Sequence, residues 1–180
     1  MEGTFEIKER CQKVIQLKGD KVILRSVDSS DIDTLLLWEN STTEPLYGVF
    51  EEQYTREDVA RFVELQQQYP IAETEQLRLM ICANNGERLG AIDLTEYDGF
   101  SASVSIIIVD SENRSRGYGS EALRLVIAYA ESIGLQILRA KVLSENKISR
   151  QIFSSAGFVC VGADNFELSL PHSATRSDLL

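Results

Sequence analysis

The residues best suited to chemistry lie in one short stretch, Arg114-Ser-Arg-Gly-Tyr-Gly-Ser120, between an apolar segment and an amphipathic one. Its two glycines lack a Cβ, so the backbone there can approach a ligand closely and adopt positive φ angles. The first amides of a helix have no intrahelical partner and lie at the positive end of its dipole, which attracts anions. With two arginines beside those amides, the stretch predicts a diphosphate site in a chain of formal net charge −10.

The spacing Gly117-x-Gly119-x-x-Ala122 also matches the dinucleotide-binding fingerprint of Rossmann folds. In a Rossmann unit the strand runs almost directly into the first glycine, whereas residues 110–116 intervene here. A P-loop is excluded, because no Gly-Lys-Ser/Thr follows the glycines. On these residues alone, an ordinary glycine turn with exposed arginines stays open.

Two further blocks extend the pattern of the glycine stretch. They are Asn146-x-x-Ser149-x-x-x-Phe153-x-x-x-Gly157-Phe158 and, near the start, Val22-Ile-Leu-Arg25 followed by Asp31. Together with Arg-x-x-Gly-x-Gly, and in the same order, these blocks resemble the GNAT superfamily of N-acetyltransferases. Within it they look like the branch of ribosomal-protein N-terminal and spermidine acetyltransferases. The resemblance covers roughly residues 20 to 165 and depends on all three blocks jointly.

The resemblance implies how acetyl-CoA would bind as a co-substrate. Pantetheine would lie as a pseudo-strand between two splayed strands and pair with the backbone of Ile107, Ile108 and Val109. Backbone amides would hold the diphosphate, with Arg114 and Arg116 assisting by charge. The amides belong to Ser115, Arg116, Gly117, Tyr118, Gly119 and Ser120.

The second block carries the residues expected at the reacting thioester. Asn146 would bond pantetheine or an ordered water there, although Asn also suits a plain helix N-cap. Many family members place a tyrosine, the proton donor to the departing thiolate, at the position of Phe153, which has no hydroxyl. Ser149, one helical turn earlier, is the alternative donor, and solvent is another.

The acceptor is expected to be a primary amine, whose pKa of roughly 10.4 calls for a base to remove its proton. Candidate bases are Asp93, Glu96 and Glu145. Acidic residues on segments where similar proteins bind their acceptors predict a cationic amine: a polyamine, another small amine or a protein N-terminus. They are Glu51, Glu52, Asp93, Glu96 and Asp98.

The elements that must position these residues alternate in type. Strands are expected over Lys21–Val27, Leu77–Ala83, Leu89–Tyr97, Val104–Val109, Leu135–Leu143 and from Phe158. Helices are expected from a cap at Ser29 or Ser30, after Thr55-x-x-Asp58, from near Ser120, and over about Asn146–Ala156. This order predicts an α+β, GNAT-like fold with a mixed, mainly antiparallel sheet, splayed central strands and flanking helices. Residues 1–20 are expected to form an N-terminal extension, and residues 21–180 the acetyl-CoA-binding domain.

Helical periodicity assigns side chains to faces. In the helix after the glycine stretch, the expected core face is Leu123, Val126, Ile127 and Ala130, with Glu121, Arg124 and Glu131 facing elsewhere. In the last helix, the expected core face is Ile148, Ile152 and Ala156.

Composition favours a single cytoplasmic enzyme domain. The 180 residues are 43% hydrophobic, with no apolar run long enough to span a membrane and a charged N-terminus unlike a signal peptide. Three widely spaced cysteines and a lone histidine, His172, predict neither a metal site nor a catalytic triad. The acidic charge argues against nucleic-acid binding.

Two other functions stay open on the sequence. An acyl-CoA-binding module with weak or no catalysis is favoured by Phe153, and a dinucleotide-binding redox domain is favoured only by the glycine spacing. Dimers are common among proteins similar to this one, so a homodimer is also open.

Overall fold

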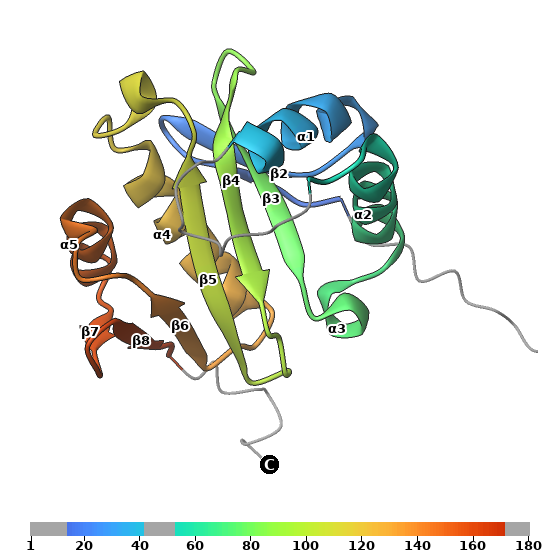
Figure 1. The fold of residues 1–180 in the computed structure, drawn as a ribbon. Helices are drawn as coiled ribbons and strands as arrows, with labels where there is room; N and C mark the ends of the chain where they lie inside the picture. The colour runs from blue at the N-terminus through green and yellow to red at the C-terminus, as the bar shows by residue number, and fades with distance from the viewer. Residues whose placement is uncertain (1–13, 42–52, 172–180) are drawn as a thin grey trace, which may run out of the picture.

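A single mixed sheet runs through the structure, a computed structural model that describes residues 14–41 and 53–171 (Figure 1). In that part of the chain the strand order is β1-β2-β3-β4-β5-β6-β8-β7, and every neighbouring pair is antiparallel except β5–β6. The strands are β1 Gln16–Lys18, β2 Val22–Ser26, β3 Leu77–Ala83, β4 Arg88–Thr95, β5 Ser101–Ile108, β6 Ile137–Lys141, β7 Val159–Cys160 and β8 Asn165–Ser169. The expected mainly antiparallel α+β sheet is confirmed, and a doubly wound dinucleotide fold, which would need a parallel sheet, is excluded.

Helices cover both faces of this sheet. They are η1 Ser29–Asp31, α1 Ile32–Ser41, α2 Arg56–Gln68, α3 Ile71–Thr74, η3 Ser111–Asn113, α4 Tyr118–Ser132 and α5 Lys147–Ser155. In Figure 1, α1 and α2 lie on one side of the sheet and α4 lies behind it. None of the described helices is long and apolar enough to cross a membrane.

Alternation along the strands divides the core in two. On β3, Leu79 and Ile81 join a cluster with Leu123 and Val126 of α4. Their neighbours Met80 and Cys82 join a second cluster with residues of α1 and α2. The predicted core face of α4 is therefore confirmed, except that Ile127 is only half-buried.

The N-terminal segment takes part in the sheet. Gln16–Lys18 pairs with β2 in the register Gln16↔Arg25 to Lys18↔Ile23. The end of the expected extension over residues 1–20 is thus an edge strand of the domain. Three residues with little alternation give no strand signal in the sequence, which is why β1 was not foreseen.

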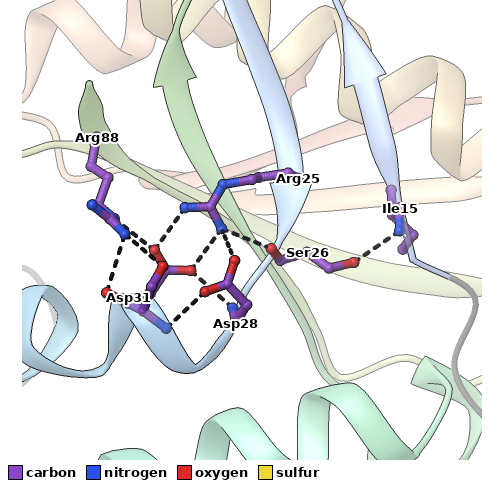
Figure 2. A network of polar contacts seen from close by, with 7 residues as sticks. Ile15, Arg25, Ser26, Asp28, Asp31 and Arg88 are labelled. Atoms are coloured by element: carbon purple, nitrogen blue, oxygen red, sulfur yellow. Dashed lines mark hydrogen bonds and ion pairs between the residues drawn. The ribbon is translucent and has the colours of Figure 1, made fainter. Parts of the chain in front are cut away.

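The start of α1 is fixed by a buried carboxylate (Figure 2). Asp28, rather than Ser29 or Ser30, is the N-cap, and it forms a capping box with Asp31. Asp31 is fully buried and receives two hydrogen bonds of 2.7 Å from the Arg25 guanidinium and one of 2.6 Å from Nε of Arg88. Asp31 therefore joins η1, which leads directly into α1, to β2 and β4.

We expect Asp31→Asn to lower the free energy of unfolding by about 2 kcal/mol. Removing one partner from a fully buried ion pair costs about 3–5 kcal/mol. The cost is smaller here because Arg25 and Arg88, which lose the carboxylate, are partly exposed and can be hydrated. Burial raises the pKa of Asp31, but the hydrogen bonds from Arg25 and Arg88 together outweigh this effect. The net pKa is therefore below its ordinary value of 3.8. The wild-type advantage should therefore be complete well above the ordinary pKa of 3.8, which the unfolded chain keeps, and be lost as the pH falls through the lower folded pKa. Urea melts of both proteins over an acid pH series measure it, and an advantage that grew on acidification would contradict this assignment.

Candidate active site

The parallel strands β5 and β6 separate partway along their length. They pair only from Ser101↔Ile137 to Ser103↔Arg139, whereas β4 accompanies β5 from Thr95↔Ser103 to Gly90↔Ile108. In the described part of the chain, residues 104–108 of β5 have no strand on their β6 side, and Figure 1 shows the two strands diverging beside α5. This confirms the expected splayed central strands. The half-buried Ile107 and Ile108 lie on the stretch of β5 beyond the last pair with β6.

The glycine stretch leads from the end of β5 into α4. Gly117 is the N-cap with φ of +86°, a conformation that favours glycine, and no side chain caps the helix. A Cβ at Gly117 would lie 3.1 Å from Nζ of Lys21. The backbone N–H groups in the first turn of α4 thus have no capping side chain. They follow the end of β5 that is not paired with β6.

The two arginines of the stretch differ in their contacts. Arg114 donates from Nε to the carbonyl of Ile108 (3.0 Å) and from Nη2 to that of Val109 (3.1 Å), so its guanidinium binds the end of β5. Arg116 is exposed, and its own carbonyl accepts a hydrogen bond from Nζ of Lys21 (3.1 Å).

Gly119 lies where β5, α4 and α5 meet. It is buried, and a Cβ there would be 3.6 Å from Cδ1 of Ile106, 3.7 Å from Cδ1 of Ile152 and 3.9 Å from Cγ1 of Ile108. These are ordinary van der Waals contacts, so the position accepts a methyl group but has an apolar wall directly beyond it.

The second block forms α5 and the turn before it. Asn146 is the N-cap of α5, with Oδ1 accepting the backbone N–H of Ser149 (3.0 Å). The Ser149 side chain is half-buried, one turn from the N-terminal end of the helix. The sequence places both residues shortly after β6, near the end of that strand at which it has left β5.

Of two other apolar residues of α5, Phe153 is buried and Ile148 is exposed. Phe153 is 3% exposed and packs edge-on against Phe158, with ring centroids 5.0 Å apart, so it belongs to the core. The prediction that Ile148 faces the core is wrong, because its side chain is 58% exposed. The helix reaches the core through its later residues, Ile152 and Phe153, while Ile148 lies in the first turn, beyond that contact.

Three of the acidic candidates, Asp93, Glu96 and Asp98, lie in the described part of the chain and have partners close by in the β3–β5 strands and turns. Asp93 accepts two hydrogen bonds from Arg78 of the neighbouring strand (2.7 and 2.9 Å), which places it in an ion pair. Glu96 lies in the β4–β5 turn and accepts a hydrogen bond from Ser103, at the end where β5 and β6 are still paired. Asp98 caps the same turn, accepting the amides of Phe100 and Ser101.

Several expected residues give no structural test of their roles. Glu145 is exposed. Glu51, Glu52, His172 and Cys11 lie outside the described residues. Within the described ranges, no group of three or more His, Cys, Asp or Glu side chains is suited to a metal ion.

Glu121 is the residue that sequence reasoning missed. It was expected to face away from the core, and that prediction is wrong: its side chain is buried against the β1–β2 hairpin and accepts the backbone N–H groups of Asp20, Lys21 and Val22. Burial raises the pKa of Glu121, but these three hydrogen bonds together outweigh burial and hold the pKa below its ordinary range. A glutamate in the first turn of an apolar helix was the available signal, but its partners are backbone groups about a hundred residues earlier, which leave no side-chain pattern.

Comparisons with known proteins agree with this arrangement. Residues 21–159 match the family model described as acetyltransferase (GNAT) domain. An uncharacterized protein of Methanocaldococcus jannaschii is 21% identical over 162 residues, which are 87% of this chain but only 32% of that protein. The chain therefore spans about a third of the length of that relative.

Solved structures share the fold at low sequence identity. Spermidine N-acetyltransferase from Vibrio cholerae, in complex with CoA and spermine, matches with a TM-score of 0.70 and 18% identity over 84% of this chain and 96% of that one. Ribosomal-protein-S5-alanine acetyltransferase from Vibrio fischeri matches with a TM-score of 0.69 and 15% identity over 86% and 96%. With the family model covering most of its length, this chain belongs to the GNAT acetyltransferase family.

Proposed function

We propose that this protein is an acetyl-CoA-dependent N-acetyltransferase, which moves the acetyl group directly to a primary amine in a ternary complex. The observation that carries the proposal is the juxtaposition of an uncapped α4 N-terminus with the end of β5 that has no pair with β6, since a Cβ at Gly119 would lie 3.6 Å from Ile106 and 3.9 Å from Ile108. Donors for a diphosphate and an unpaired strand edge for the pantetheine amides then lie in one continuous path. The CoA complex of the spermidine acetyltransferase of similar fold supports this choice of co-substrate.

The residues of the glycine stretch fit a diphosphate. Gly117 gives the backbone its positive φ, and the amides of the first α4 turn have no capping side chain. Arg116 adds positive charge, while Arg114 would act mainly by fixing the end of β5. Backbone groups of Ile107 to Val109 would pair with pantetheine, with the carbonyls of Ile108 and Val109 using the lone pair that Arg114 does not occupy. Side chains such as Ile108 pack in the core at the same time.

The transfer itself has few requirements. The neutral amine attacks the thioester carbonyl, a C–N bond forms, the C–S bond breaks, and the amine loses a proton as the thiolate gains one. Ser149 is the proposed proton donor to the thiolate, since Phe153 is buried and carries no hydroxyl. Asn146 would hold the turn before α5 through its cap and orient Ser149.

An assay of CoA thiol release with a panel of amines tests the proposal. Wild-type protein with acetyl-CoA should release CoA faster when a suitable amine is added, with acetylated amine as the co-product. Tight CoA binding without turnover on any amine would favour the acyl-CoA-binding module, which the buried Phe153 also favours. Absence of CoA binding would overturn the proposal.

We further expect a positively charged acceptor. The chain carries a net charge of −10, and one structure of similar fold holds spermine. Acidic surfaces raise the local concentration of cations, an effect that salt screens. The kcat/KM for the best cationic amine should therefore exceed that for a neutral amine of equal size and fall as ionic strength rises. Equal values for both amines at every salt concentration would contradict this expectation.

A further inference from the structure

The turn of the β1–β2 hairpin is attached to the first turn of α4 by Glu121. Its Oε2 accepts the N–H groups of Lys21 (2.7 Å) and Val22 (2.8 Å), and its Oε1 accepts that of Asp20 (3.1 Å). Glu121 is only 7% exposed. A buried carboxylate with three donors from one turn holds that turn in a defined place.

Two further contacts leave the hairpin little freedom. A Cβ at Gly19 would lie 2.8 Å from the carboxyl carbon of Glu121, so a larger residue there would displace this carboxylate from its place. The carbonyl of Asp20 accepts a hydrogen bond from Nδ2 of Asn84 (2.7 Å), in the β3–β4 turn. The hairpin is therefore fixed from two sides, by α4 and by the neighbouring strands.

This arrangement places the Lys21 ammonium on the glycine stretch. Its Nζ donates to the carbonyl of Arg116 (3.1 Å) and lies 3.1 Å from the position of a Cβ on Gly117, the N-cap of α4. An ammonium has three donors. Within the described residues the contact with Arg116 uses one of them, and the Lys21 side chain is exposed.

We propose that Lys21 binds the diphosphate of the co-substrate and that Glu121 is the positioning residue that holds it there. The proposal rests on the proposed function, because it assigns a further ligand to the same site. Glu121 brings a negative charge into the first turn of α4, where it would repel an anion, and Lys21 offsets that charge at the same end of the helix. The Arg114 guanidinium binds the carbonyls at the end of β5, so within the glycine stretch the charge for an anion comes mainly from Arg116, and Lys21 adds a second cation beside it.

The first test compares Lys21→Met with Lys18→Met by calorimetric titration with CoA. Lys18 lies on β1 of the same hairpin and has the same charge, but within the described residues it has no hydrogen bond or ion pair to the glycine stretch. We expect Lys21→Met to weaken CoA binding about tenfold, as for one partly exposed charge-assisted hydrogen bond, and Lys18→Met to leave it nearly unchanged. Dephospho-CoA, which lacks the 3′-phosphate but keeps the diphosphate, should show the same loss.

The second test is a double-mutant cycle with Glu121→Gln, which removes the charge and one acceptor at constant size. If Glu121 acted only by its charge, Glu121→Gln would tighten CoA binding. If Glu121 positions Lys21, Glu121→Gln should weaken CoA binding in the wild-type background. In the Lys21→Met background the same substitution should change CoA binding little further. Thermal melting of each variant confirms that the titrated protein is folded.

The outcomes separate this inference from the proposed function. A wild-type protein that binds no CoA defeats the proposed function. A wild-type protein that binds CoA, with equal affinities for Lys21→Met and Lys18→Met, defeats the inference alone. A loss seen with CoA but not with dephospho-CoA would overturn the assignment to the diphosphate, and tighter binding by Glu121→Gln would overturn the positioning role.

Discussion

Gly119→Glu is expected to abolish CoA binding, whereas Gly119→Ala should retain it. The Cβ direction at this position meets Ile106, Ile108 and Ile152 at van der Waals distance, so a methyl group fits but a longer polar chain does not. A glutamate would have to turn outward, toward the amides of the first α4 turn. Its carboxylate would then occupy or repel the place of the diphosphate, and a loss of about a hundredfold or more in affinity is expected.

Calorimetry on folded protein distinguishes the causes. The alanine variant changes only volume, and it serves as the matched control for the glutamate variant. Wild-type affinity in Gly119→Glu would show that the diphosphate is not held at the start of α4. Loss of binding in Gly119→Ala as well would show that close backbone approach, and not the added carboxylate, decides affinity.

Features with local causes were predictable from the sequence. Asn85-Gly86 predicted the β3–β4 hairpin, and Gly86 adopts a φ of +88° between those strands. The capping box of Thr55 and Asp58 starts α2 as expected. The glycine stretch between an apolar strand and an apolar-faced helix predicted the β5–α4 unit, and α4 begins at Gly117 without a side-chain cap.

Features that depend on strand register could not be predicted in this way. Asp93 has the same sequence signal whether or not it is ion-paired, and only the register Arg78↔Asp93 shows that it pairs with an arginine. Glu121 and the hairpin it holds meet only because β2 lies against α4 in the folded domain. A sequence pattern gives the period of a helix face, but it does not say which long-range backbone donors will reach that face.

Ser149→Ala is expected to lower kcat about a hundredfold, the usual contribution of a general acid, while leaving CoA affinity close to that of wild type. The hydroxyl belongs to the half-buried Ser149 in the first turn of α5, held by the Asn146 cap, and its removal deletes no backbone contact of the proposed CoA site. The deficit should narrow as the pH rises past about 8.5, because a free thiolate then leaves without needing a proton.

Ser154→Ala is the matched control for this prediction, since it makes the same chemical change in the same helix at an exposed position. Its kcat should equal that of wild type, so that a deficit confined to Ser149→Ala is assigned to the proton and not to helix stability. Steady-state assays of thiol release over a pH series provide the measurement. An unchanged kcat in Ser149→Ala would assign the proton to solvent, and a deficit that stayed constant with pH would show that the hydroxyl acts by positioning instead. Phe153 carries no hydroxyl and packs against Phe158 and Phe166, so the side chain at that position cannot supply the proton in place of Ser149.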